Sequence, residues 1–180
     1  MQIRLFADAN PILDEPVAYD DHVEPDGVER PVRLHSAFTG LHRLEVLPPS
    51  NSAMVEVPDT HVPLTFPASL DHHNRLVSRW SLYFYVPRGT TVIGGYTASG
   101  RLGHIRDSAG ESHCDFSKLP QEAYFSVVVP EGQDGKLWKF DGCFGNKFLL
   151  TVPPWVACNA ESLLLPREVL ERDSQVDHKR

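Results

Sequence analysis

Short runs of alternating apolar and polar residues follow one another along the middle of the chain, and Gly, Pro, Asn and Asp separate them. Alternation with a period of two turns successive side chains to opposite faces, so each run predicts a β-strand. The clearest run is residues 80–86. Its even positions are all apolar and predict a core face, whereas its odd positions Ser81, Tyr83 and Tyr85 predict an amphipathic outer face.

The pattern as a whole predicts an antiparallel β-sandwich of jelly-roll type with roughly ten short strands. The count of 15 Pro and 12 Gly supports this all-β fold class, and Asp134-Gly135 is typical of a hairpin. Pro166 at a first helical position predicts a short C-terminal helix over residues 166–172. We expect one domain over residues 1–173 and a charged, frayed tail over 174–180. The predicted strands are residues 2–6, 31–36, 41–47, 53–57, 61–66, 80–86, 90–98, 102–106, 124–129, 136–141 and 147–152.

The net charge of −7 limits the classes of ligand that we expect this chain to bind. A negative protein repels phosphate backbones, so we expect no nucleic-acid partner, and a neutral, hydroxyl-rich or cationic ligand fits better. No run approaches 18 apolar residues, and the first residues lack the basic and apolar regions of a signal peptide, so we expect no membrane segment. Either a cytoplasmic protein or a module of a longer exported chain fits these features.

Three cysteines are too few for a disulfide framework. We therefore expect Cys114, Cys143 and Cys158 to be buried thiols. A bond between Cys143 and Cys158 is the alternative.

Aromatic and polar side chains on the predicted outer surface are the candidates for ligand binding. Flat aromatic rings with nearby hydroxyls match the apolar faces and polar rims of sugars, as Tyr83 and Tyr85 would on one strand face. The alternative is that both rings fill a second buried layer or simply cover the sheet. Trp155 follows two prolines, where a core and a surface cleft fit equally, whereas Trp138 shares a predicted core face with Phe140. The candidate ligand-binding residues are Tyr83, Tyr85, Tyr96, His104, Arg106 and Trp155.

An acidic segment near the amino terminus supports two other kinds of site. Residues 24–29 match E-x-D-x-x-E, the catalytic string of one group of jelly-roll glycoside hydrolases, but Pro25 and Gly27 interrupt the strand that this chemistry requires. Loop oxygens also suit a structural calcium, although the spacing is not that of an EF-hand and a solvated acidic loop is the alternative. The candidate calcium ligands are Asp20, Asp21, Glu24 and Asp26. Nucleophile-elbow, zinc and lyase motifs are missing from the sequence, so we expect no catalytic residues.

Four strings between Gly40 and Asp173, about three quarters of the chain, carry a family resemblance. They are residues 40–43 (GLHR), 80–87 (WSLYFYVP), 132–138 (GQDGKLW) and 163–169 (LLLPREV). The chain resembles a jelly-roll accessory domain, similar to carbohydrate-binding modules, found near the C-terminus of large exported bacterial proteins. This resemblance implies a secreted module with flanking domains in a longer parent chain. It implies no individual site residue.

Three functions follow from these observations. The one favoured by the sequence is a non-catalytic carbohydrate-binding module that recognises a polysaccharide or oligosaccharide through surface aromatic residues. A structural or interdomain module without sugar binding is the first alternative, and it predicts an exposed apolar patch. A polysaccharide lyase or glycoside hydrolase with unfamiliar catalytic residues is the second, and it predicts a groove with a charged cluster.

Overall fold

The computed structural model describes residues 1–12, 14–24, 26–48, 53–57, 62–71, 75–76 and 78–177. Its contacts divide the chain into two compact units, Met1–Pro58 and Asp59–Arg180, which are described separately below. Within the described residues the strands form three antiparallel sheets, followed by one short C-terminal helix. The mostly β architecture confirms the predicted class, and the single domain over residues 1–173 stays a prediction.

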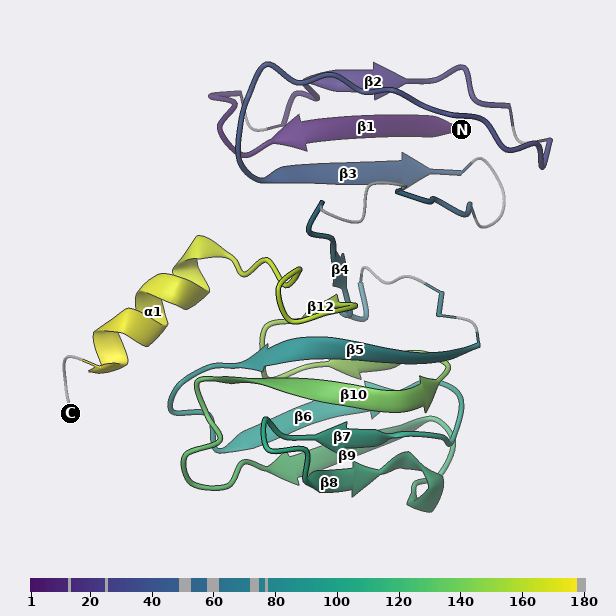
Figure 1. Cartoon of the computed structure of the whole chain (residues 1–180). Coiled ribbons are helices and arrows are strands. Elements are labelled where there is room, and N and C mark those ends of the chain that lie inside the picture. Colours follow the sequence, from purple (N-terminus) through teal and green to yellow (C-terminus); the bar gives the residue numbers. More distant parts are fainter. Residues whose placement is uncertain are drawn as a thin grey trace. The chain divides into compact units, whose positions relative to one another are not determined.

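Unit 1 contains a three-stranded sheet in the order β2-β1-β3 (Figure 1). Its strands are β1 (Gln2–Ala7), β2 (Ala18–Asp20) and β3 (His42–Leu47). Burial in the described part of this unit is sparse: the buried apolar residues there are Ile3, Phe6 and Ala7. The Arg43 guanidinium lies 4.3 Å from the centre of the Phe6 ring. A small sheet with so few buried side chains gains little from the hydrophobic effect.

Unit 2 contains two sheets (Figure 1). The six-stranded sheet has the order β4 (Thr65–Pro67), β12 (Trp155–Ala157), β5 (Arg79–Val86), β10 (Lys136–Phe144), β7 (His104–Arg106) and β8 (Ser112–Asp115). The three-stranded sheet has the order β11 (Lys147–Leu149), β6 (Val92–Thr97) and β9 (Ala123–Val128). A 3₁₀ turn, η1 (Phe116–Lys118), follows β8, and helix α1 (Arg167–Asp177) ends the unit.

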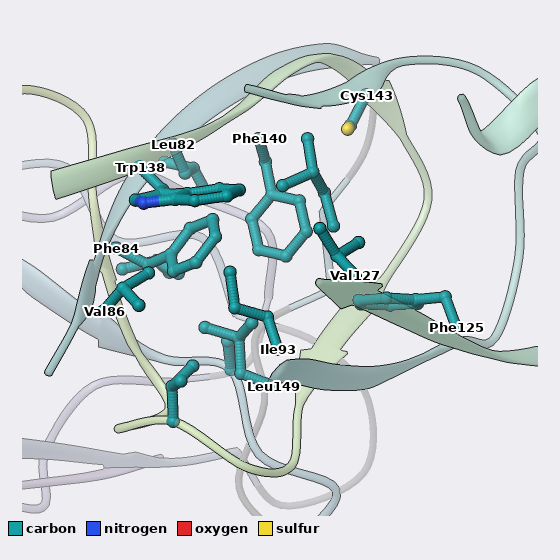
Figure 2. Close-up of a cluster of buried hydrophobic side chains, with 14 of the residues drawn as sticks. Leu82, Phe84, Val86, Ile93, Phe125, Val127, Trp138, Phe140, Cys143 and Leu149 are labelled. Atoms are coloured by element: carbon teal, nitrogen blue, oxygen red, sulfur yellow. The ribbon is translucent and has the colours of Figure 1, made fainter. Parts of the chain in front are cut away.

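Both sheets of unit 2 contribute side chains to one hydrophobic core (Figure 2). Trp138 and Phe140 of β10 and Phe84 of β5 are fully buried, as are Ile93 of β6 and Leu149 of β11. The even positions of β5 therefore form the predicted core face. Burial of such large side chains is the main favourable contribution to folding of this unit.

The thiols and several short elements differ from the sequence-based expectations. All three cysteines are free, but Cys143 is buried, Cys114 is half-buried and Cys158 is exposed, so the prediction of three buried thiols is wrong for Cys158. Among the residues that the structure describes, residues 31–36 and 53–57 pair with no strand, whereas β2, β8 and β12 are strands that the pattern does not predict.

The C-terminal helix is present where Pro166 predicts it and continues beyond residue 172 to Asp177. Its first turn closes on the Pro166 carbonyl, which accepts hydrogen bonds from the N–H groups of Val169 and Leu170. Residues 178–180 of the predicted tail lie outside the described part of the chain. The helices of the described residues are too short and too polar to span a bilayer.

Candidate functional site

The face of the six-stranded sheet that points away from the core, called the outer face below, gathers most of the predicted ligand-binding residues. In β5, alternation turns Tyr83 to this face because its neighbours Leu82 and Phe84 are buried in the core. The pairing of β5 with β10 places Lys139 opposite Tyr83, and the pairing of β10 with β7 places Arg106 opposite Lys139. Three side chains distant in sequence thus form one row across the sheet.

An open hollow of about 610 Å³ lies over this row and is called the outer-face hollow. Tyr83, Arg106, Leu137 and Lys139 are among the residues that line it, and the turn of residues 107–110 after β7 also contributes. A broad, open hollow of this kind admits an extended ligand that lies across the strands.

Asp141 of β10 ties the two cations of the row together. Its carboxylate accepts hydrogen bonds from Lys139 Nζ at 2.9 Å and from Arg106 Nε at 3.0 Å. Ser81 Oγ donates a third bond at 3.2 Å. These donors, with the Lys139 ammonium first among them, hold the pKa of Asp141 below its ordinary value. The Lys139 ammonium also lies 5.6 Å from the centre of the Tyr83 ring, within the range of a cation–π contact.

The turn beside the hollow is organised by a buried carboxylate, Asp107. Its Oδ1 accepts the backbone N–H groups of Ala109 and Glu111, both at 2.9 Å, while its Oδ2 lies 2.8 Å from His113 Nε2. Burial alone would raise the pKa of Asp107, but the His113 bond and the two N–H donors bring it below the ordinary value. The turn is thereby held in one conformation.

Arg106 and His113 connect this turn to the strands. Arg106 Nη1 donates to the Gly110 carbonyl at 2.9 Å, and the His113 ring packs 5.1 Å from the Trp138 ring. The wall of the outer-face hollow is therefore fixed both to β7 and to the hydrophobic core.

The predicted binding residues occupy different surroundings. Tyr83 and Arg106 line the outer-face hollow. His104 lies on the same face, one strand away from β10, with its Nδ1 3.1 Å from Ser112 Oγ. Trp155 also faces outward, because the next residue in β12, Val156, is buried in the core. Tyr96 lies in β6 of the other sheet, where its ring packs 5.0 Å from Tyr124. The structure thus brings Tyr83 and Arg106 together and places Tyr96 elsewhere.

Tyr85 shares the outer face with Tyr83, but its hydroxyl is committed to the C-terminal helix. It donates a short hydrogen bond to Asp173 of α1, and that buried carboxylate also accepts the Arg88 N–H. Burial and the bond to Asp173 raise the pKa of the Tyr85 phenol well above its ordinary value. This tyrosine therefore anchors α1 to the end of β5.

The four carboxylates predicted to bind calcium lie in unit 1 and are not drawn together. Asp26 forms a bidentate pair with Arg30, with both distances at 2.6 Å, and this guanidinium lowers the pKa of the Asp26 carboxyl. Asp20 accepts the N–H of His22 instead. Among the described residues, Asp107, Glu111 and His113 form the group whose ligand atoms lie within 4.8 Å of one another. Both oxygens of Asp107 are already engaged, Oδ1 by the backbone N–H groups of Ala109 and Glu111 and Oδ2 by His113.

Sequence reasoning missed Lys136, Lys139 and Asp141 as residues of this site. Alternation along β10 would have placed Lys139 and Asp141 opposite the core residue Phe140, on the outer face. The missing information was the strand pairing, which sets Lys139 beside both Tyr83 and Arg106.

No protein-family model, curated protein or solved structure matches this chain.

Proposed function

We propose that unit 2 is a jelly-roll β-sandwich that acts as a non-catalytic carbohydrate-binding module and recognises a polysaccharide at the outer-face hollow. The observation that carries this proposal is the row of Tyr83, Lys139 and Arg106 across one open sheet face. An aromatic ring offers an apolar surface to the CH face of a sugar, and the adjacent cationic donors reach its oxygen atoms.

The open shape of the hollow supports a polymer as the ligand. A small molecule is usually bound in a concave pocket that buries most of its surface, whereas an open sheet face accommodates an extended chain. Such a surface buries little area per sugar. We therefore expect micromolar to millimolar affinity, about 4 to 8 kcal/mol.

The state of the nearby carboxylates favours binding over catalysis. A glycosidase needs a carboxylic acid with a raised pKa as its proton donor. Asp107 and Asp141 instead have lowered pKa values, because hydrogen-bond donors hold each in its charged form. Neither carboxylate is suited to donate a proton to a leaving group at neutral pH.

Affinity electrophoresis in native gels that contain a panel of soluble polysaccharides tests this function. We expect at least one polysaccharide to retard the protein, and Tyr83→Ala to abolish that retardation while the circular dichroism spectrum stays unchanged. Tyr124→Ala is the matched control, because Tyr124 is an exposed tyrosine on the other sheet. Retardation that survives Tyr83→Ala would refute the outer-face hollow as the site, and absence of retardation across the panel would refute the function.

An interdomain role is the second candidate, and the outer side of the three-stranded sheet favours it. Val92 of β6 pairs with Val128 of β9, and Tyr96 pairs with Tyr124 on the same side. Val128 is 72% exposed and Tyr124 73% exposed, so apolar surface faces solvent there. As a module of a longer exported protein, the chain would have neighbouring domains to cover it. Sedimentation of the full chain and of Val128→Lys tests the face: self-association lost in the variant supports a contact role, and an unchanged profile argues against it.

A further inference from the structure

We propose that the polysaccharide bound at the outer-face hollow is acidic, with carboxylate or sulfate groups on its sugars. This inference rests on the proposed carbohydrate-binding function and specifies its ligand. The whole-chain charge of −7 suggested a neutral or cationic ligand, but the local charge around the hollow has the opposite sign. Local charge decides recognition at a site, because solvent and salt screen more distant groups over about 10 Å.

The residues that line the hollow carry three cations, Arg106, Lys136 and Lys139. One lining residue is acidic, Asp107, and its two oxygens accept bonds from His113 and from backbone N–H groups of the turn. Asp141 is the second carboxylate to be counted, since it pairs with Lys139 and Arg106. Arg106 and Lys139 lie on the outer face, whereas Lys136 is paired with Val86 and shares the alternation of Trp138, so it lies at the rim of the hollow. With Asp107 and Asp141 counted, the charged residues around the hollow carry one net positive charge.

Lys136 is the lining residue whose positive charge is least neutralised. It is exposed at the start of β10, and no ion pair of Lys136 occurs among the described residues. By contrast, Lys139 and Arg106 share the single carboxylate of Asp141, so their combined charge is only half neutralised. An anionic group on the ligand would complete the pairing of Lys139 and Arg106, and Lys136 would add positive charge from the rim.

The arrangement of ring and cations agrees with a charged sugar as the unit of recognition. The Lys139 ammonium lies 5.6 Å from the centre of the Tyr83 ring, and Lys139 is opposite Arg106, so a sugar that stacks on Tyr83 in place of this ammonium has its substituents beside two cationic side chains. A carboxylate on a uronic acid or a sulfate ester projects from the ring edge and reaches such donors while the ring face stays stacked. Glu111 of the turn is not among the lining residues, and neither are Glu131 and Asp134 of the loop that Ser108 reaches through Gln133.

Matched pairs of polymers test the charge separately from the sugar. The gels contain polygalacturonate or its methyl ester, carboxymethyl cellulose or hydroxyethyl cellulose, and dextran sulfate or dextran. Polyglutamate is added as a polyanion without sugar. The variants are Tyr83→Ala and Lys136→Gln, with Lys118→Gln as the matched control. Lys118 is a highly exposed lysine in η1, outside the lining of the hollow.

We expect the charged member of a pair to retard the protein and its neutral counterpart to bind at least about tenfold more weakly. Lys136→Gln should weaken binding about threefold, Lys118→Gln should leave it unchanged, and 0.5 M salt should reduce it further. Whether the carboxylated or the sulfated polymer responds identifies the anionic group.

Three outcomes would overturn the inference in different ways. Equal retardation by charged and neutral partners, lost in Tyr83→Ala, would keep the carbohydrate function and refute the acidic ligand. Retardation by polyglutamate as strong as by the acidic polysaccharides, or equal losses in Lys136→Gln and Lys118→Gln, would reduce the effect to non-specific charge attraction. Absence of retardation by every saccharide would refute the proposed function itself.

Discussion

The two faces of the six-stranded sheet come from the same strands but hold their side chains in different ways. On the inner face, Phe84 and Val86 are fully buried against other apolar side chains. On the outer face, Ser81, Tyr83 and Tyr85 are partly exposed, and two of them reach carboxylates through their hydroxyls. The inner face contributes most to stability, because the free energy of burial scales with the apolar area removed from water.

The outer face is ordered although it is not buried. Asp141 holds Lys139 and Arg106, and Asp107 holds the adjoining turn. Each exposed ion pair contributes little to stability, but together they fix the positions of the side chains around the hollow. A site organised in advance loses less conformational entropy when a ligand binds. The comparison therefore separates residues that stabilise the fold from residues that prepare a surface.

Two substitutions at neighbouring positions of β5 should give the largest difference in stability between the two faces. Phe84→Ala removes a fully buried ring and should lower the free energy of unfolding by about 3 to 5 kcal/mol. Tyr83→Ala, one residue away on the outer face, should lower it by less than about 1 kcal/mol. Urea denaturation of both variants measures the difference. Losses of similar size would show that the outer face is part of the core.

Lys147 of β11, in the three-stranded sheet, is a buried lysine next to the core, and its titration should give the second largest effect on stability. Its ammonium lies near the Phe116 ring and donates to three backbone carbonyls, those of Ser99, Gly100 and Phe144, at 2.7 to 2.9 Å. These bonds favour the charged form, but burial outweighs them and lowers the pKa of Lys147 to about 8. The folded state therefore loses a proton that the unfolded state still binds between pH 8 and 10.5.

Stability should consequently rise with pH across that interval, by about 2 to 3 kcal/mol relative to Lys147→Met. The cost of the buried charge is fully present below pH 8 and is relieved above it. Urea denaturation at pH 7, 8.5 and 10 measures this difference between wild type and variant. The exposed Lys118→Met should follow the wild-type curve. A constant gap between wild type and Lys147→Met would contradict the lowered pKa.

Removal of the hydrogen bond between Tyr85 and Asp173 should give the third largest loss of stability. Tyr85→Phe keeps the ring but removes the hydroxyl that donates to the buried Asp173 carboxylate in α1. An under-satisfied buried carboxylate should cost about 1 to 2 kcal/mol and should loosen the helix from the end of β5. Urea denaturation and limited proteolysis within residues 167–177 measure both effects. Tyr124→Phe removes an exposed hydroxyl and should change neither.

Sequence patterns predicted the inner face far better than the site. Alternation identified Phe84 and Trp138 as core residues, because burial on one face of a strand leaves a direct period-two signal. Residues 31–36 carry a similar pattern but pair with no strand in the described part of the chain, since a short pattern does not reveal whether a partner is available. The three-residue strands β2 and β12 are too short to produce the pattern at all.

The outer-face hollow depends on contacts that local patterns do not contain. Tyr83 and Arg106 were predicted individually, from the chemistry of their side chains. Their proximity arises from β10, which lies between β5 and β7 in the sheet but follows both in the sequence. Asp141 and Arg106 are 35 residues apart, and their bond follows from the strand register. Long-range pairing of this kind has no signature in a single sequence.

Asp141→Asn gives the smallest change in stability and the most direct separation of the two faces. The substitution keeps the shape of the side chain and removes the one carboxylate shared by Lys139 and Arg106, all three of which are about one-third exposed. Exposed ion pairs contribute little, so the free energy of unfolding should fall by less than about 1 kcal/mol. The net charge beside the hollow becomes more positive, and retardation by an acidic polysaccharide should increase about two- to fivefold. Weaker retardation would instead show that Asp141 is needed to position the two cations, and the outer face would then depend on its pairing as strongly as the inner face depends on its packing.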